Sequence, residues 1–358
     1  MTGSPALYVT NYNRDFTGVS ASIAGVAREQ AKTLDLRLVG NRLPGAPVPI
    51  TRAEARHLSR TPPLGKAFSI WHVRRNVEMA SAIWARDVLR LPIRVVFTSA
   101  AQHRHSAVPR WLISRMDAII ATSAGAAQFF SEVAAVIPHG VDTERYRPAE
   151  DRRAAWEALG YGGDRGVAIV GRVRPEKGTD VFVDAMIRVM EQDKSTVALV
   201  LGATKPTHRA FLDRLKHKVT ANGLAQRIRF LGFVGHDAQP KILRALSLVV
   251  NVARYEPFGL VPLEGMASGT PFVATATGYY REFSADGRTG KIVEPGDVEG
   301  TAHAVSEILA DPDRIERMGA ASRQLAERCY SIAREVGEIG TVYDRLWSSR
   351  APPRTPRR

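Results

Sequence analysis

The sequence predicts an α/β protein with two doubly wound, Rossmann-like domains that face one central cleft. Its length of 358 residues fits two domains. Hydrophobic residues make up 44% and charged residues 24%, which supplies enough apolar material for two cores and excludes a disordered chain. Short β-branched runs also alternate with longer amphipathic segments. This alternation is typical of parallel sheets that helices cover on both faces.

The first half of the chain contains six short runs that we interpret as strands and two longer segments that we interpret as helices. The strands are predicted at residues 6–10, 36–39, 68–71, 94–98, 118–121 and 135–137, and the helices at 20–33 and 77–89. These elements predict a first domain over residues 1–145.

The second half repeats the alternation. Strands are predicted at residues 167–170, 197–201, 228–231, 248–250 and 271–275. Charged residues and glycines interrupt the pattern between residues 142 and 164, so we predict a second domain over residues 146–329. Ligands of such folds bind at the carboxyl ends of the strands. Residues 348–358 contain three prolines and four arginines, which predicts a disordered basic tail.

The charge of the chain indicates an anionic partner. Fifty Lys and Arg residues against 36 Asp and Glu give a net charge of +14, and ten basic residues but only two acidic ones lie between Arg60 and Arg115. A phosphorylated substrate, a phospholipid surface and nucleic acid would each suit this charge, and a solvated basic face is the alternative. No recognition motif for DNA or RNA accompanies it, so we expect no nucleic-acid partner.

The cysteine content and the hydropathy of the sequence limit the cellular compartments that we expect for the protein. The single cysteine, Cys329, cannot form an internal disulfide, which fits a reducing compartment such as the cytoplasm. The N-terminus lacks a basic segment followed by an apolar one, and no apolar run approaches the ~20 residues that span a bilayer. We therefore expect a soluble protein, or one that lies on a membrane surface.

Two phosphate-binding motifs of α/β folds are absent from the sequence. The 29 glycines form no Gly-x-Gly-x-x-Gly, and neither Gly65-Lys66 nor Gly290-Lys291 completes a P-loop. The one Asp-x-Asp pair, at residues 311–313, could hold a divalent metal. However, Asp311 precedes a proline at a predicted helix start, where N-capping explains it. We predict no essential metal and no cofactor.

The strongest local signal is the segment 254–271, which follows the apolar run 248–250. Pro262 marks a helix start and Gly269 a helix end. We expect the amides around Phe258, Gly259 and Leu260 to form a helix N-terminus that holds phosphate or sugar oxygens.

Two carboxylates frame this helix N-terminus. Glu256 lies in the loop and Glu264 about two turns later, so they would contact the two ends of one bound molecule. Carboxylates accept hydrogen bonds from sugar hydroxyls. A loop charge and a solvated helix residue are the alternative interpretation.

A second charged turn, residues 171–178, follows the predicted strand 167–170. Gly171 would lie at the carboxyl end of that strand. Arg172 and Lys177, brought together by the turn at Pro175, could hold a diphosphate and neutralise a leaving group. A plain charged turn would have a similar sequence.

Together these residues resemble family 4 of the retaining GT-B glycosyltransferases, over nearly the whole chain. The family's Glu-x7-Glu motif matches Glu256 and Glu264, its Gly-Arg-x4-Lys-Gly segment matches residues 171–178, and its interdomain Ile-Pro-Asn-Gly-Val-Asp turn matches residues 137–142 with His139 in place of Asn. Residues 70–76 and 98–105 resemble, more finely, the mannosyltransferases of lipopolysaccharide core assembly in α-proteobacteria, which use GDP-mannose.

The resemblance implies a GT-B fold and a metal-independent, retaining hexosyltransferase of EC 2.4.1 type. It implies transfer of mannose from GDP-mannose to a lipid-linked, anionic lipopolysaccharide core acceptor by same-face attack, with the departing diphosphate helping to deprotonate the acceptor hydroxyl. A last helix, at about 330–347, would pack back on the first domain.

The resemblance also implies roles on the donor side. Glu256 would contact the donor sugar, Glu264 the nucleotide ribose, and Arg172 with Lys177 the diphosphate. The loop 231–234, with Phe233 and Val234, would pack on the base. Gly18, before the first long helix, stands where the family's glycine-rich loop approaches the donor phosphates; a simple helix-entry turn is the alternative.

The first domain should hold the acceptor. His72 ends an apolar strand and is followed by Arg74 and Arg75, so we expect all three to face the cleft and contact the acceptor; a structural histidine is the alternative. His103 lies near the family's active-site histidine and is a candidate catalytic residue. His105, two residues later, is a candidate acceptor contact.

The basic segment and its tryptophans, Trp71, Trp84 and Trp111, lead us to expect a peripheral protein at the inner face of the cytoplasmic membrane. Three rival functions remain open. A UDP-sugar-dependent transferase for another cell-envelope glycan would share the donor residues. A nucleotide-sugar epimerase or a sugar phosphorylase could use the same fold. A nucleotide-sugar-binding module is disfavoured by the basic first domain.

Overall fold

The computed structural model describes residues 4–101 and 103–349, and the chain divides into two compact units. Unit 1 comprises the residues up to Gly140 together with those from Ile332 onward, and unit 2 comprises Val141–Ser331. The division thus falls at 140 and 331, where the sequence predicted limits of 145 and 329. Of the predicted tail, residues 350–358 lie outside the described residues, and Ser348 belongs to a helix rather than to a disordered segment.

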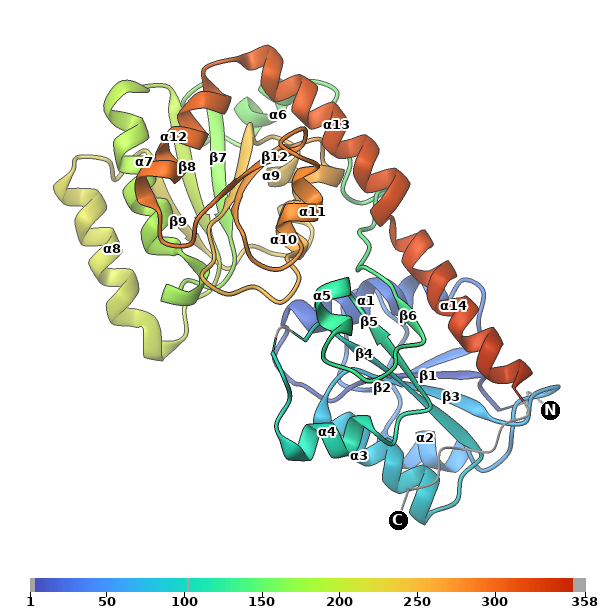
Figure 1. The fold of residues 1–358 in the computed structure, drawn as a ribbon. Coiled ribbons are helices and arrows are strands. Elements are labelled where there is room, and N and C mark those ends of the chain that lie inside the picture. Colours follow the sequence, from blue (N-terminus) through green and yellow to red (C-terminus); the bar gives the residue numbers. More distant parts are fainter. Residues whose placement is uncertain (1–3, 102, 350–358) are drawn as a thin grey trace. The chain divides into compact units, whose positions relative to one another are not determined.

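Unit 1 is built on a six-stranded parallel sheet with the order β2-β1-β3-β4-β5-β6 (Figure 1). Its strands are β1 (Leu7–Asn11), β2 (Leu36–Gly40), β3 (Ser69–Val73), β4 (Ile93–Ser99), β5 (Ala118–Ala121) and β6 (Ala135–Val136). Its helices are α1 (Gly18–Gln30), α2 (Arg52–Leu58), α3 (Asn76–Ile83), the π-helix η1 (Trp84–Val88), α4 (Ala107–Ile113), α5 (Ala124–Ala127) and α14 (Ile332–Ser348).

Buried side chains pack on both faces of the unit 1 sheet. On one face Ile23 of α1 and Tyr343 of α14 join a core with Ile70 of β3. On the other face Met79 of α3 packs in a core with Trp71, the next residue along β3. Successive side chains of a strand point to opposite faces, so β3 is buried on both.

Unit 2 repeats this plan with the strand order β12-β11-β10-β7-β8-β9, again all parallel. Its strands are β7 (Arg165–Val170), β8 (Thr196–Leu201), β9 (Ile228–Gly232), β10 (Leu248–Asn251), β11 (Phe272–Thr275) and β12 (Gly290–Val293). Its helices are α6 (Arg152–Ala158), η2 (Pro175–Lys177), α7 (Thr179–Gln192), η3 (Pro206–His208), α8 (Arg209–Ala221), α9 (Ala238–Leu243), α10 (Leu260–Ala267), α11 (Tyr280–Ser284), α12 (Val298–Leu309) and α13 (Pro312–Tyr330).

These two sheets confirm the predicted α/β fold class. The predicted strands match the observed ones to within about two residues at each end, but β12 was missed. The helical segment predicted at 77–89 is present, but it consists of two parts: α3 ends at Ile83, and the chain continues directly as the π-helix η1. The capping interpretation of Asp311 is confirmed: its side chain accepts a hydrogen bond from the Arg314 amide at 3.0 Å at the start of α13.

The strand order of unit 2 determines where its loops meet. β7 lies between β10 and β8, so the chain crosses the sheet in one direction from β7 to β9 and then returns to β10. The strand order therefore reverses between β7 and β10. In open parallel sheets such a reversal leaves a crevice at the carboxyl edge, where ligands bind.

Candidate active site

The candidate donor site consists of the two loops that follow β7 and β10. Gly178, in the first loop, has φ of +69°, and a Cβ there would lie 1.9 Å from the carbonyl oxygen of Val252 in the second loop. Only glycine permits this approach. Arg254 of the second loop forms a paired contact with Asp180, with both nitrogen–oxygen distances at 2.8 Å, and its amide donates to the Glu176 carbonyl. The loops are thus held together.

This packing brings together two of the predicted site residues. Lys177 Nζ lies 2.5 Å from Glu256 Oε2, although 79 residues separate them in the sequence. The side chains are 20% and 13% exposed, so a ligand could still reach the pair. Charged hydrogen bonds of this kind are stronger when partly shielded from water.

Arg172 and Gly171 lie in the same first loop. Gly171 follows β7 directly, and its amide donates to the Leu201 carbonyl of β8. Arg172 is half-buried and forms no hydrogen bond or ion pair with any residue that the structure describes. An arginine without a protein partner beside a Lys–Glu pair is suited to bind a diphosphate.

The second loop leads into α10, whose N-terminus has no side-chain cap because the cap residue is Gly259. The first amides of a helix lack intrahelical acceptors and favour anions. Gly259 has φ of +104° and packs on the ring of Tyr280. The Phe258 side chain is buried and stacks on Tyr279 with ring centroids 5.2 Å apart. The backbone of Gly259 and Leu260, rather than the Phe258 ring, is therefore available to a ligand.

Glu264, on the second turn of α10, has two partners that sequence reasoning missed. The Tyr146 hydroxyl donates to Oε1 at 3.1 Å, and the Gln239 amide donates to Oε2 at 2.6 Å. Burial raises the pKa of Glu264 to about 7, against the opposing effects of Tyr146, Arg145 and Gln239. No motif marks Tyr146 or Gln239, because they reach Glu264 from elements distant in the sequence.

A pocket of about 330 Å³ lies beyond the carboxyl ends of β7, β8 and β9. Val173, Gly202 and Gly232 contribute to its wall, with Arg209 and Lys216 of α8 on the side. Phe233 borders it and is 76% exposed, while Val234 packs against the core. An exposed aromatic ring beside a pocket at this edge can stack on a planar base. The base contact of Phe233 and Val234 stays a prediction.

Unit 1 places three predicted site residues at its surface or near it. Gly18 is exposed at the first turn of α1, and no atom lies within 4 Å of where its Cβ would be. His103 is exposed, and its ring lies 6.4 Å from that of His105. His105 contacts the ring of Phe130 at 5.9 Å, and burial together with His103 lowers its pKa. Their contacts with donor or acceptor stay predictions.

His72 does not face an open edge, so that prediction is wrong. Its side chain is 1% exposed; Nδ1 lies 2.5 Å from the Tyr343 hydroxyl and Nε2 lies 2.7 Å from Thr98 Oγ1. Burial and the nearby Arg74 hold its pKa well below the ordinary value, so the ring is neutral. The prediction failed because α14, which covers His72, lies 271 positions away in the sequence.

Arg74 and Arg75 have different environments. Arg75 donates to Asn11 Oδ1, to Glu78 Oε1 and to Ser20 Oγ, all at 3.0 Å, and so joins the ends of β1 and β3 to α1. All three guanidinium nitrogens of Arg74 are buried, and none has a hydrogen-bond partner in the described part of the chain. Burial lowers the pKa of Arg74, and the negative charges of Glu335 and Glu78 oppose this effect without forming hydrogen bonds to the guanidinium. Buried donors without acceptors are costly, so an anionic group that reached Arg74 would satisfy them.

The basic segment is less exposed than its composition suggests. Arg86 is buried and pairs with Asp87 and with Asp117, which also pairs with Arg94. Trp71 is fully buried and donates to Ser59, so its inclusion with the exposed tryptophans is wrong. Trp84 of η1 and Trp111 of α4 are 43% and 52% exposed, and the exposed arginines of this region are Arg90, which follows η1, and Arg110 of α4.

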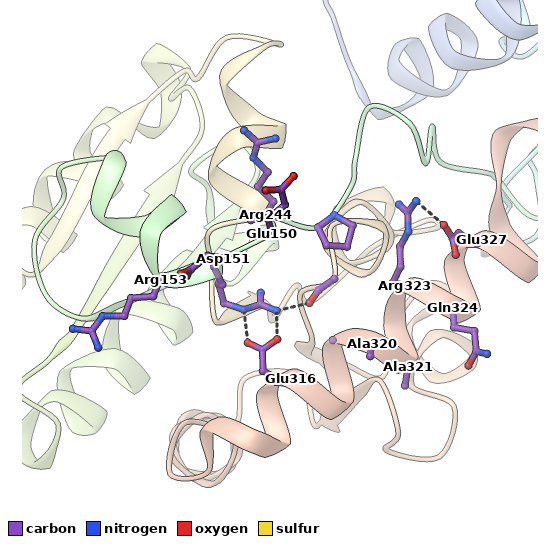
Figure 2. Close-up of a pocket in the computed structure, with 15 residues that line it drawn as sticks. Glu150, Asp151, Arg153, Arg244, Glu316, Ala320, Ala321, Arg323, Gln324 and Glu327 are labelled. Atoms are coloured by element: carbon purple, nitrogen blue, oxygen red, sulfur yellow. Dashed lines mark hydrogen bonds and ion pairs between the residues drawn. The ribbon is translucent and has the colours of Figure 1, made fainter.

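A larger pocket, of about 1010 Å³, lies at the opposite edge of the unit 2 sheet (Figure 2). Its lining residues Arg244 and Gly269 precede β10 and β11, so it borders the amino ends of these strands. Arg152 pairs with Glu316. Arg323 pairs with Glu327, as a dashed line in Figure 2 shows. The charged side chains that line this larger pocket are thus largely paired within the protein, so we do not assign donor binding to the pocket.

Within residues 4–101 and 103–349, no group of three or more His, Cys, Asp or Glu side chains is placed to hold a metal ion. None of the helices there has the length and apolar character that crossing a bilayer requires.

Comparison with known proteins identifies the family. Residues 153–325, most of unit 2, match the model of glycosyl transferases group 1. The lipopolysaccharide core biosynthesis mannosyltransferase LpcC of Rhizobium leguminosarum bv. viciae is 39% identical over 342 residues, which cover 94% of this chain and 95% of that protein. The corresponding enzyme LpsB of Rhizobium meliloti (strain 1021) is 38% identical over 94% of this chain and 96% of its own length.

Solved structures support the fold. HepE of Anabaena, in complex with UDP and glucose, superposes with a TM-score of 0.80 at 18% identity, over 96% of this chain and all of that one. The C-terminal domain of the group 1 glycosyl transferase LpcC from Francisella tularensis covers 54% of this chain and 100% of that domain, with a TM-score of 0.52 and 33% identity. The predicted GT-B architecture is confirmed, and the chain is a member of the glycosyl transferases group 1 family.

Proposed function

We propose that the protein transfers mannose from GDP-mannose, with retention of configuration, to a lipid-linked lipopolysaccharide core acceptor. The observation that carries this proposal is the cluster of Lys177, Glu256 and Arg172 beside the uncapped N-terminus of α10. The names of the two Rhizobium relatives, which the chain matches over almost its whole length, support the sugar and the acceptor.

The site suggests how the donor is held. The diphosphate binds Arg172 and Lys177, whose positive charges stabilise the negative charge that develops on the leaving group. The first amides of α10 donate to the phosphate or sugar oxygens. Glu256, next to Lys177, accepts hydrogen bonds from the sugar hydroxyls, and Glu264 accepts those of the ribose.

Donor binding also changes the partner of Lys177 within the site. In the structure Glu256 neutralises Lys177. A bound diphosphate carries more negative charge than one carboxylate and competes for Lys177, which frees Glu256 for the sugar. Two cations already face the diphosphate, so we propose that the reaction needs no divalent metal ion.

For the acceptor we propose a contact with Arg74 in unit 1. Its buried, unpartnered guanidinium would gain hydrogen-bond acceptors from an anionic group of the acceptor. The nearby Glu78 carboxylate does not satisfy this guanidinium, because it accepts from the backbone amide of Arg74 and from Thr10, Tyr12 and Arg75 instead.

We also propose that the enzyme works on the inner face of the cytoplasmic membrane. Trp84 of η1 and Trp111 of α4 are exposed, and an ion pair between Asp87 and Arg115 at 3.3 Å holds the two segments side by side. Exposed arginines, Arg90 and Arg110, flank them. Tryptophan and arginine together favour the surface of an anionic bilayer.

Mass spectrometry of reaction products tests the proposal. The purified protein is incubated with isotope-labelled GDP-mannose, with and without a lipid-linked core acceptor, and in parallel with UDP-glucose. We expect the mass of one hexose to be added to the acceptor from GDP-mannose only. Transfer from UDP-glucose alone would favour the UDP-sugar alternative. Epimers have the same mass, so NMR spectra of the donor are recorded as well, and an epimerised donor sugar without transfer would indicate an epimerase.

A further inference from the structure

A buried hydroxyl without a hydrogen-bond partner lies beneath the candidate donor site. Tyr280 is 0% exposed, and its hydroxyl oxygen has no partner among the described residues. Leaving a buried hydroxyl unpaired lowers stability, and most buried polar groups are paired. Its retention at this position therefore needs an explanation, which a partner that arrives during the reaction would supply.

The loop before α11 packs directly on the loop that carries Glu256. A Cβ at Gly259 would lie 2.0 Å from Cε1 of Tyr280 and 2.6 Å from Cζ, the carbon that bears the hydroxyl. A Cβ at Gly278 would lie 3.1 Å from the carbonyl oxygen of Glu256, and the Tyr279 amide donates to the Phe258 carbonyl at 2.8 Å. The Tyr280 hydroxyl is thus fixed at the N-terminus of α10.

Glu256 is the charged group that acts on this hydroxyl. Burial and, after it, the negative charge of Glu256 raise the pKa of Tyr280 well above its usual value, so the phenol keeps its proton and can donate it to a hydrogen bond. In the structure, however, Oε2 of Glu256 is paired with Lys177 instead.

We propose that Tyr280 is a positioning residue for Glu256: once the diphosphate of a bound donor has drawn Lys177 away, the Tyr280 hydroxyl donates a hydrogen bond to the Glu256 carboxylate. This hydrogen bond holds the carboxylate ionised and oriented toward the sugar hydroxyls. The inference rests on the proposed function, because it requires a donor diphosphate at Lys177.

The test is Tyr280→Phe, which removes only the hydroxyl. We expect kcat for transfer from GDP-mannose to fall at least about tenfold, as for loss of a hydrogen bond to a charged group. The KM for the donor should stay within about twofold, since this bond forms to Glu256 and not to the substrate.

Thermal stability separates this role from a structural one. Tyr280→Phe removes an unpaired buried hydroxyl, so the melting temperature should stay the same or rise. The matched control is Tyr8→Phe, at a tyrosine of unit 1 that is also 0% exposed, for which we expect unchanged kcat. An unchanged kcat in Tyr280→Phe would overturn the inference, and so would a loss of kcat together with a lower melting temperature and loss of GDP binding.

A double-mutant cycle tests whether Tyr280 acts through Glu256. Tyr280 acts through Glu256, so in a Glu256→Gln background a Tyr280→Phe substitution should change the residual rate less than twofold. An undiminished effect in that background contradicts the inference. Wild-type protein that transfers no mannose from GDP-mannose contradicts the proposed function as well, whereas active wild type with an equally active Tyr280→Phe contradicts the inference alone.

Discussion

The environment of Glu264 predicts how stability should depend on pH in a Glu264→Gln variant. The residue is half-buried as a whole, but its carboxyl group is enclosed, and burial raises its pKa from 4.5 to about 7. Glutamine has nearly the same shape: its carbonyl oxygen can accept from Tyr146, and Gln239 can turn its side-chain amide over to accept from the new NH2 group, so the substitution removes chiefly the titrating charge. The variant therefore isolates the cost of ionising this carboxyl group.

The direction and size of this pH dependence follow from the difference between the pKa of Glu264 in the folded protein and in the unfolded chain. The folded protein holds the Glu264 proton more tightly than the unfolded chain does, so the contribution to stability is fully present below pH 4.5 and is lost as the pH rises through about 7. A pKa change from 4.5 to about 7 corresponds to about 3 kcal/mol, of which about 2.5 kcal/mol falls between pH 5 and pH 8. Relative to wild type, Glu264→Gln should gain that much stability over this range.

Urea-induced unfolding of both proteins at pH 5, 6, 7 and 8 measures this difference. Only the difference between variant and wild type is used, so titrations of other groups cancel. GDP affinity at the same pH values gives a second result: it should improve with pH more in wild type, whose ionised carboxylate accepts from the ribose, than in the variant. A stability difference that does not change from pH 5 to pH 8 would refute the reasoning.

Three other predictions test the proposed chemistry and location. Lys177→Ala and Glu256→Ala should each lower transfer by at least about a hundredfold, as for groups that act on transition-state charge or orientation, while circular dichroism shows an intact fold; near wild-type turnover in either variant would remove that residue from the site. Transfer should persist in excess EDTA, and a requirement for added Mg²⁺ or Mn²⁺ would contradict the role given to Arg172 and Lys177. Sedimentation with anionic vesicles should weaken as salt rises, because charges are screened beyond about 8 Å at physiological salt. Removing Arg90 and Arg110 should weaken binding to anionic vesicles about 25-fold, at about 1 kcal/mol for each arginine. Neutralising Arg153 and Arg214 of unit 2 should leave this binding unchanged, and equal binding to neutral vesicles would count against the proposed membrane surface.

Local patterns were sufficient to predict the parallel sheets. Strands such as β7 and β8 are buried over most of their length, so they consist of continuous apolar and β-branched residues with polar turns on either side. The Asp311 cap is equally local, because a capping side chain reaches only the first turn of its own helix. β12 escaped prediction because it is an edge strand with two half-buried residues, including Lys291, and so lacks the apolar run.

The proximity of Lys177 and Glu256 could be predicted because each lies in a loop that follows a strand. Lys177 and Glu256 belong to loops after neighbouring strands, and parallel strands bring such loops to one edge. The contacts that surround them could not be predicted, because they join segments without a shared pattern. Tyr146 reaches Glu264 across 118 positions. Tyr280 lies against Gly259 only because the loop before α11 folds back on the loop before α10.

The acceptor side was harder to predict for the same reason. The sequence showed His72 at a strand end but not α14, which returns to unit 1 and covers it. Likewise, the basic segment was counted up to Arg115, and Asp117, two residues further on, neutralises Arg86 and Arg94. Charge counts over a segment miss pairs that tertiary packing forms across its limits.

The anomeric configuration of the product tests the central claim most directly. GDP-mannose carries an α-linked sugar, and the proposed same-face route, with Arg172 and Lys177 stabilising the departing diphosphate, retains that configuration. NMR spectroscopy of the isolated product, formed from GDP-mannose labelled with ¹³C at the anomeric carbon, reports the new linkage. We expect a single α-mannosyl linkage on the acceptor, formed at least about a hundredfold more slowly when Lys177→Ala replaces the wild type. A β-linked product, or none with any lipid-linked core acceptor, would contradict it.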